Sequence, residues 1–296
     1  MTKTCIYWLH TLSPTHAGVG RGVGYIDLPI DRDGVTGWPI IRGSAFKGVW
    51  ADHFRATSDK RNKDPMLRAA FGIAGDDNNS NAGALIPTDA KIVCLPVRSF
   101  RGTFAWATSP LVLQMLHRSL TLAEFSDVPE APPMIKEGKA HHSDESVIFE
   151  SGKIYLEDLD FTAQKCRTAA KWANWIGENV FDNSWRDHFK KRFVILPDDA
   201  FNFLCETGTE VHTRVRIDDD TKTVAKGALW TEESLPAETI LMGLIHRDRV
   251  YGRDGTEIKA DDLIKNFTCK DLTLQIGGKA TVGRGQVRCV FTEMKE

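Results

Sequence analysis

The sequence predicts a mixed α+β fold, and three kinds of local pattern lead to this prediction. Phe46, Val49 and Trp50 recur at the three- and four-residue steps of an amphipathic helix. Residues 211–229 alternate with period two around an Asp-rich turn, as in a long β-hairpin. Extended runs rich in β-branched and aromatic residues occur near both ends of the chain, at 4–9, 272–276 and 286–291.

Composition places the 296-residue chain among soluble globular proteins that can bury a substantial core. It contains no apolar run long enough to span a bilayer, so we expect no membrane association. The six cysteines lack the close spacing of a zinc knuckle or redox pair, which predicts reduced thiols and a cytoplasmic protein. The formal net charge of −2 is not that of a stand-alone nucleic-acid binder, so any RNA site must be a local stripe.

A glycine-rich loop follows the first predicted strand. Glycines occupy every second position from Gly18 to Gly24, and the loop then reaches one acidic residue, Asp27, between apolar neighbours. Glycine allows sharp bends and close approach to a ligand, so this loop with its single carboxylate is a candidate working site. The alternative is that Asp27 is a turn residue bonded to its local backbone. His16 is either a second acid or base, or a structural loop residue.

The first helix is predicted to begin at Ser44, which is a favourable N-cap residue. Three residues later a Glu would complete a capping box, but the chain has Lys47, which cannot accept a hydrogen bond. At least one backbone N–H should then stay free beside a positive charge. The helix start is therefore predicted to bind an anion or a phosphate.

The middle of the chain gives weaker signals. Residues 84–97 contain strand-like runs broken by prolines, which suit strands near a sheet edge. The segment after them interleaves Arg98 and Arg101 with three aromatics, a composition that suits RNA contact, although core packing is favoured. Ser109 and Pro110 form a cap and first-turn pair that opens another helix.

Residues 126–152 are rich in Pro, Gly, Ser and charge, and are predicted to form an insertion loop. His141 and His142 lie within it, but adjacent histidines point apart in regular structure, so a metal site is not favoured. Two helices follow, at 171–176 and 184–193, whose tryptophans have the spacing of core residues.

The long hairpin and the C-terminal loop both carry basic residues. The basic residues that point outward from the hairpin are more numerous than solubility requires, although an ordinary charged hairpin is an equally good interpretation. The loop GGKATVGRG at 277–285 is neither a Walker A sequence nor a dinucleotide fingerprint. Its glycines instead allow backbone amides to approach phosphates. The basic residues concerned are Arg214, Arg216, Lys222 and Lys226 in the hairpin, and Lys279, Arg284 and Arg288 at the C-terminus.

Together these segments resemble the RAMP superfamily of CRISPR-associated proteins, whose hallmark is a glycine-rich C-terminal loop. HAGVGRGVGYIDLPIDRDGVTGWPIIRGSAFKGV, LPVRSFRGTFAWAT and TEVHTRVRIDDDTKTVAKGALWTEESLP look like segments of the backbone nuclease subunits of type III-B (Cmr) effector complexes. The resemblance implies a modified ferredoxin-like, RRM-like RAMP fold with insertion loops. It implies one domain over 1–296, an insertion and helical region at 126–190, and a protruding hairpin, the thumb, at 208–235.

The function implied by this resemblance is assembly along a CRISPR RNA with copies of the chain and other Cmr subunits, and cleavage of complementary target RNA at regular intervals. Asp27 falls on the family's catalytic acidic position. Ser44 and Lys47 fall on a helix-start motif that contacts guide phosphates, where Ala45 departs from the usual small polar residue. The RNA-binding residues implied are Arg42, Gly43, Ser44, Lys47, Arg98, Arg101, Arg214, Arg216, Gly277, Gly278, Lys279 and Arg284.

Asp27 can serve as a general base or as the ligand of a divalent cation, Mg²⁺ or Mn²⁺. One carboxylate makes a poor cage, so we expect the cation only together with RNA phosphates. Glu232 and Glu233 are weaker catalytic candidates. Three different functions would fit the same segments: a purely structural RNA-binding backbone, the equivalent subunit of the type III-A (Csm) complex, and a guide-processing ribonuclease of the same superfamily.

Overall fold

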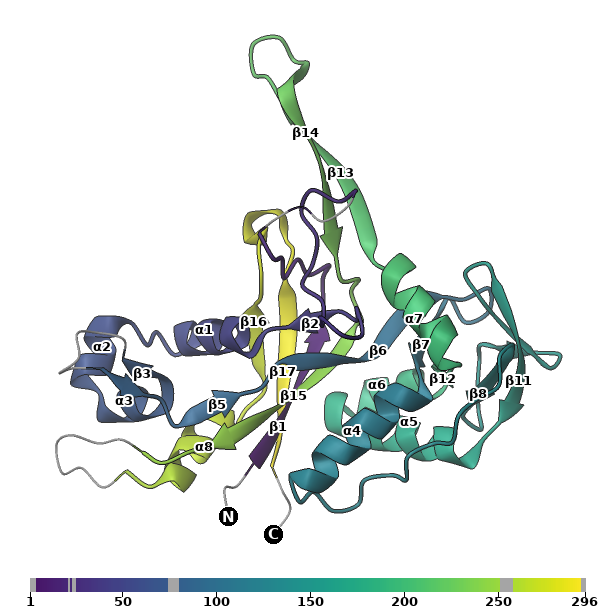
Figure 1. Ribbon diagram of the computed structural model, residues 1–296, viewed down its shortest axis with the longest axis horizontal. Helices are drawn as coiled ribbons and strands as arrows, with labels where there is room; N and C mark the ends of the chain where they lie inside the picture. The colour runs from purple at the N-terminus through teal and green to yellow at the C-terminus, as the bar shows by residue number, and fades with distance from the viewer. Residues whose placement is uncertain (1–3, 21, 23–24, 74–79, 251–257, 294–296) are drawn as a thin grey trace.

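The computed structural model of the chain describes residues 4–20, 22, 25–73, 80–250 and 258–293; Gly24 of the predicted glycine run lies outside them (Figure 1). A mixed thirteen-stranded sheet runs through the described part. Its main path is β16 (Leu272–Gln275), β17 (Gln286–Glu293), β1 (Thr4–Thr11), β15 (Ile240–Arg247), β6 (Ala90–Arg98), β7 (Phe104–Thr108), β12 (Phe193–Ile195), β8 (Lys139–His142), β11 (Leu159–Lys165), β10 (Lys153–Leu156) and β9 (Phe149–Glu150), with β2 (Ile40–Ile41) beside β6 and β5 (Leu85–Pro87) beside β15.

The structure confirms the strands predicted near both ends of the chain. Strand β1, the first of them, lies inside the main sheet. It pairs antiparallel with β17 on one edge and β15 on the other. All eight of its residues are buried. Ile6 and Trp8 contact one hydrophobic core, whereas Tyr7 and Leu9 contact another on the opposite face. This burial on both faces explains why the strand reads as a nearly continuous apolar run.

One group of helices covers the face of Tyr7 and Leu9, on the left of Figure 1. The predicted helix around Phe46 and Trp50 is confirmed, and Phe46 stacks on Tyr7 with ring centroids 4.1 Å apart. A small sheet of β3 (Gly72–Ile73) and β4 (Asn81–Ala82) accompanies the group. Its helices are α1 (Gly43–His53), α2 (Ser58–Lys63), α3 (Pro65–Phe71) and α8 (Ala260–Thr268).

A second group of helices lies on the right of Figure 1. It comprises α4 (Pro110–Leu122), α5 (Arg167–Val180), α6 (Asn183–Lys190) and α7 (Asp198–Thr207). Ser109 caps α4 as predicted, because its hydroxyl accepts the Val112 N–H at 3.4 Å. Trp172 is buried in the core. Trp185, by contrast, is 48% exposed, so its predicted core position was wrong.

The structure corrects three other expectations in this half of the chain. Strand β6 is interior to the sheet; Pro96 is accommodated because the β15 ladder ends at Cys94, before the proline. The region 126–152 is not only a loop, since β8 and β9 belong to the main sheet. Phe193 belongs to β12 and not to the helix before it. The composition of the sequence did not reveal β8, β9 and β12 because each is only two to four residues long.

The predicted hairpin is confirmed, as β13 (Glu210–Ile217) and β14 (Val224–Ser234). It projects from the rest of the molecule as a separate two-stranded sheet (Figure 1). Asp218 holds the turn by accepting the N–H groups of Asp220 and Thr221. The last three residues of β14, 232–234, are buried, whereas most of the outer hairpin is exposed or half-buried, so this end anchors the hairpin.

Candidate functional site

The loop that carries Asp27 lies against the buried end of β14, the segment Trp230–Ser234, which we term the hairpin base. The Leu28 N–H donates to the Thr231 carbonyl at 3.0 Å, and the Glu233 N–H donates to the Leu28 carbonyl at 2.9 Å. These bonds form a parallel bridge between Leu28 and Glu232. Since β13 pairs with the other edge of β14, the hairpin base is held between β13 and the Asp27 loop.

Asp27 is bonded to one residue of the hairpin base, Thr231. Its Oδ2 accepts the Thr231 N–H at 2.8 Å and the Thr231 hydroxyl at 3.0 Å, and its own N–H donates to the Thr231 Oγ1 at 3.0 Å. The backbone bond and then the hydroxyl bond lower the pKa of the Asp27 carboxyl. The side chain is exposed, and Oδ1 has no hydrogen-bond partner among the described residues. The main hydrogen bonds of the carboxylate thus reach β14, 204 residues away, and the backbone N–H of Asp27 itself makes a smaller contribution.

His16 is tied to the same segment. Its Nδ1 lies 2.6 Å from the Glu233 carbonyl. Because a carbonyl only accepts, Nδ1 carries the proton, and Nε2 is the acceptor of the neutral ring. The ring is half-buried. His16 and Asp27 are thus attached to residues 233 and 231 of one strand, and Nε2 is the atom of His16 that can exchange a proton.

Glu232, a weaker candidate in the sequence, is buried and paired. Its side chain accepts from Lys279 Nζ at 2.8 Å and from the Trp230 indole at 2.7 Å, with Arg214 Nε at 3.4 Å. Burial opposes ionisation of Glu232, but these cations and donors outweigh it, so the pKa of its carboxyl is lowered. Glu232 therefore joins the hairpin base to the C-terminal loop as a carboxylate.

Glu233, the other weaker candidate, is 2% exposed. Its Oε1 accepts from Arg32 at 2.6 Å and from the Thr209 hydroxyl at 2.8 Å. Its Oε2 accepts the Ile30 N–H at 3.0 Å. With both oxygens engaged inside the protein, Glu233 anchors the segment that follows Asp27 and offers no free atom to a ligand.

The predicted C-terminal loop also supports the site from within. Gly277 has φ +81°, and a Cβ there would lie 2.1 Å from the His16 carbonyl, so only glycine fits. The Gly278 N–H donates to that same carbonyl at 3.0 Å. Arg284 is 8% exposed and donates to the Ser234 hydroxyl at 2.8 Å. The phosphate contacts predicted for Gly278 and Arg284 therefore find no support in this geometry, and Lys279 is already paired with Glu232.

The predicted anion site at the first helix needs a correction. Helix α1 begins at Gly43 after Arg42, not after a Ser44 cap, and the Gly43 N–H donates to Asp89 at 2.8 Å. Arg42 is bound by Asp31 through contacts of 2.6 and 3.0 Å. Sequence patterns could not supply Asp89, which comes from a strand start 46 residues away. Ser44 is exposed and Lys47 is half-buried.

The remaining predicted RNA-binding arginines are surface groups. Arg101 pairs with Glu150 at 2.9 Å, and Arg98 and Arg216 are exposed. Arg98 ends β6 and Arg101 lies in the connection to β7, both in the main sheet region, whereas the hairpin forms a sheet of its own. Their RNA contacts stay predictions.

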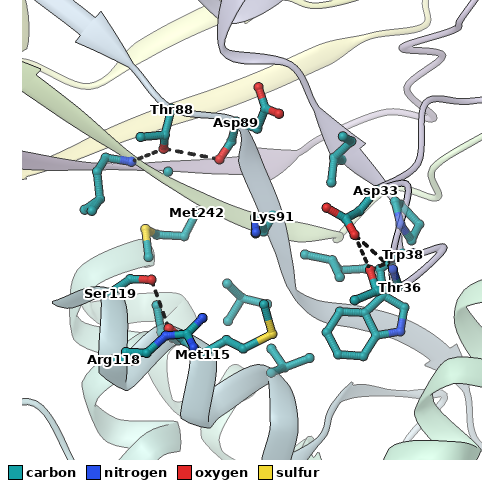
Figure 2. Close-up of a pocket in the computed structure, with 18 residues that line it drawn as sticks. Asp33, Thr36, Trp38, Thr88, Asp89, Lys91, Met115, Arg118, Ser119 and Met242 are labelled. Carbon is teal, nitrogen blue, oxygen red and sulfur yellow. Dashed lines mark hydrogen bonds between the residues drawn. The ribbon is translucent and has the colours of Figure 1, made fainter. Parts of the chain in front are cut away.

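A separate cavity of about 360 Å³ lies between α4 and strands β6 and β15 (Figure 2). Trp38, Met115 and Met242 contribute to its apolar wall, and Asp33, Lys91 and Arg118 are among its polar residues. Of the described residues predicted to act on RNA, none lines it. The candidate site is therefore the exposed surface at the hairpin base and not this cavity.

Comparisons with known proteins identify the family to which this chain belongs. The RAMP superfamily matches residues 8–288. The CRISPR system Cmr endoribonuclease Cmr4 of Pyrococcus furiosus is 34% identical, over 99% of this chain and 97% of its own. The chain belongs to the RAMP superfamily and, within it, to the Cmr4 family.

Solved Cmr4 structures have the same fold. The crystal structure of oligomeric Cmr4 from Pyrococcus furiosus superposes with a TM-score of 0.76, at 29% identity and over 100% of both chains. A chain of the type III-B Cmr-beta complex bound to cognate target RNA gives a TM-score of 0.73 at 21% identity, over 97% of this chain and 96% of that one. These likenesses confirm the predicted fold class.

The side chains at this Cmr4-family site supply only part of what a divalent cation needs. An exposed carboxylate oxygen is a ligand that Mg²⁺ accepts. Within the described ranges, no group of three or more His, Cys, Asp or Glu residues is arranged to hold a metal ion. His141 and His142 accordingly belong to no such group in the described part. Asp27 can contribute one ligand, and the others must come from water and a bound phosphate.

None of the helices in the part described combines the length and apolar character needed to cross a membrane.

Proposed function

We propose that this chain is the backbone subunit of a type III-B (Cmr) effector complex, and that it binds CRISPR RNA and cleaves guide-paired target RNA at Asp27. The observation that carries the proposal is the exposed Asp27 carboxylate, held by one oxygen against the base of a projecting hairpin. The named endoribonuclease function of a relative that matches 99% of the chain supports it. Oligomer formation by the Pyrococcus furiosus protein supports assembly with copies of the chain.

The lowered pKa of Asp27 bears on its role. A general base is most effective when its pKa lies near the working pH, so a carboxylate whose pKa is lowered is a weak base toward a ribose 2′-hydroxyl. The same effect keeps Asp27 ionised, which favours a role as ligand of a divalent cation beside the scissile phosphate. Bound there, Mg²⁺ or Mn²⁺ supplies charge stabilisation to the phosphoryl oxygens. The hairpin orients the RNA backbone against Asp27, and Nε2 of His16, whose ring is bonded to the hairpin base, is a candidate for proton exchange.

The test uses Asp27→Ala and Asp27→Asn in the assembled complex with end-labelled target RNA and Mg²⁺. We expect cleavage to fall by about 100-fold or more, with guide and target binding retained. Asp52→Asn, which removes an exposed carboxylate in α1, is the matched control and should cleave normally. Undiminished cleavage by the Asp27 variants would favour a structural RNA-binding backbone.

Three further measurements test the metal dependence, the type of complex and guide processing. Chelation of divalent cations should abolish cleavage by the wild-type complex, and added Mg²⁺ or Mn²⁺ should restore it. Cleavage that persists in the chelator contradicts the metal dependence.

Identification of co-purifying subunits distinguishes type III-B from type III-A. Sequence-specific cleavage of repeat RNA by the isolated chain would instead assign guide processing.

A further inference from the structure

We propose that Thr231 is a positioning residue that couples the placement of the hairpin to the orientation of the Asp27 carboxylate. The inference rests on the proposed function of Asp27. Thr231 belongs to β14 and Asp27 to the N-terminal loop, 204 residues apart in the chain. The contact between them is thus made only when the loop docks on the hairpin base.

Three hydrogen bonds join these two residues. The Thr231 N–H and hydroxyl both donate to Oδ2, at 2.8 and 3.0 Å, and the Asp27 N–H donates to the Thr231 Oγ1 at 3.0 Å. The hydroxyl has one proton, and its other acceptor, the Tyr25 carbonyl, is farther away at 3.4 Å. Two donors on one oxygen fix the rotation of the carboxylate and leave Oδ1 directed away from Thr231.

Thr231 supplies most of this restraint on the side chain, since its two hydrogen bonds outweigh the contribution of Asp27's own backbone N–H. Asp27 is exposed, and within the described ranges no other residue hydrogen-bonds its carboxylate. Apolar packing therefore cannot hold the side chain, and the position of Oδ1 depends on where β14 places Thr231. Since the Leu28 N–H also donates to the Thr231 carbonyl, a movement of the hairpin base moves the backbone and the carboxylate of the loop together.

This arrangement makes hairpin placement a condition for cleavage. If contacts along the hairpin shift β14, the carboxylate shifts with it, and a misplacement of about 1 Å at a reacting group can cost about 100-fold in rate. The Thr231 hydroxyl is needed for this positioning as well as the Thr231 N–H, because without the hydroxyl Thr231 gives the Asp27 carboxylate only one donor.

The experiment compares Thr231→Val, which loses the hydroxyl, with Thr231→Ser, which keeps it, in the assembled complex with Mg²⁺ and labelled target RNA. We expect the valine variant to cleave about 10- to 100-fold more slowly at saturating target, with target affinity unchanged. The serine variant should recover most of the rate. Thr213→Val is the matched control, because Thr213 pairs with Thr231 across the hairpin and is exposed. It should cleave normally.

A double variant tests whether Thr231 acts through Asp27. On an Asp27→Asn background, Thr231→Val should reduce the residual rate no further. If the valine variant fails to assemble, Thr231→Ala carries the same test. A wild-type rate in Thr231→Val, equal damage in valine and serine variants, or a loss confined to target affinity would each overturn the inference. Normal cleavage by Asp27→Asn alone would instead overturn the proposed function, and this inference with it.

Discussion

Lys47 lies in α1 as a cation without an anionic neighbour among the described residues. Burial lowers the pKa of its ammonium group, and the nearby guanidinium of Arg61 lowers it further. No carboxylate contributes to these influences, whereas Arg42, at the start of the same helix, is paired with Asp31. A half-buried cation beside another cation is destabilised in the free chain, and a bound phosphate relieves that repulsion.

We therefore predict that Lys47→Ala weakens guide binding in a salt-dependent way. Loss of one phosphate contact should reduce the slope of log affinity against log salt by about 0.7 to 0.9. Lys47→Arg should keep most of the slope, and Lys91→Ala, an exposed lysine at the cavity of Figure 2, should leave it unchanged. Affinity of the assembled complex for guide RNA, measured at several salt concentrations, checks this. An unchanged slope in Lys47→Ala counts against a phosphate at this helix.

The residues of the site differ in how far the sequence could reveal them. Asp27 stands out as a candidate because its loop is unusual in composition. Thr231 carries no such signal, because a threonine in a strand is ordinary and its partner is 204 residues away. The environment of Arg284 is hidden for a related reason: its charge is visible in the sequence, but its burial against Ser234 is a property of the packed loops.

At the scale of elements, the hairpin base is the junction of three segments. It binds the Asp27 loop through Thr231, the preceding loop through the contact of His16 with Glu233, and the C-terminal loop through Glu232 and Lys279. The hairpin was predictable because its period-two pattern is long, and the terminal strands because they are runs rich in β-branched and aromatic residues. The interior position of β6 and the short strands β8 and β9 were not, because they depend on pairing partners that a local pattern does not specify.

The Glu232–Lys279 pair gives this junction a pH-dependent stability. A carboxyl whose pKa is lowered on folding contributes stability above its unfolded pKa, near 4.3, and loses it as the pH falls through the folded value. Lys279→Met removes a cation that lowers this pKa. We predict that it decreases the free energy of unfolding by about 1 kcal/mol at pH 7, a figure reduced for the partial exposure of Lys279.

The difference from wild type should shrink as the pH falls below the unfolded pKa, near 4.3, and disappear below the lowered folded pKa, where Glu232 is protonated in both proteins. Urea unfolding at pH 7 and at acidic pH measures it. Lys270→Met is the control, since Lys270 is exposed and no ion pair involves it in the part of the chain described. A deficit in Lys279→Met that stays constant across this pH range contradicts the assignment.

At the scale of the whole molecule, the hairpin has little support from the rest of the described fold. It forms a sheet of its own, and large apolar side chains on both strands are exposed, including Val211, Val215 and Leu229. A two-stranded hairpin is marginally stable alone, so these side chains favour contact with another molecule. The formal net charge of −2 fits this interpretation, because basic groups such as Arg216 lie on the projection while the chain as a whole is not basic.

The last prediction therefore separates the outer end of the hairpin from its base. Ile217 pairs with Val224, so residues 218–223 can be replaced by Asn-Gly, a two-residue turn that keeps this pair and the buried base. The shortened chain should still fold and bind guide RNA, because the hairpin base and α1 are unchanged. In the assembled complex, target RNA should be cut less efficiently or at altered spacing, since the outer hairpin no longer reaches the duplex. Asp219→Ala with Asp220→Ala, which keeps the turn held by Asp218, separates lost charge from lost length. If the shortened chain gives the wild-type pattern and rate of cleavage, the hairpin does not act as the thumb.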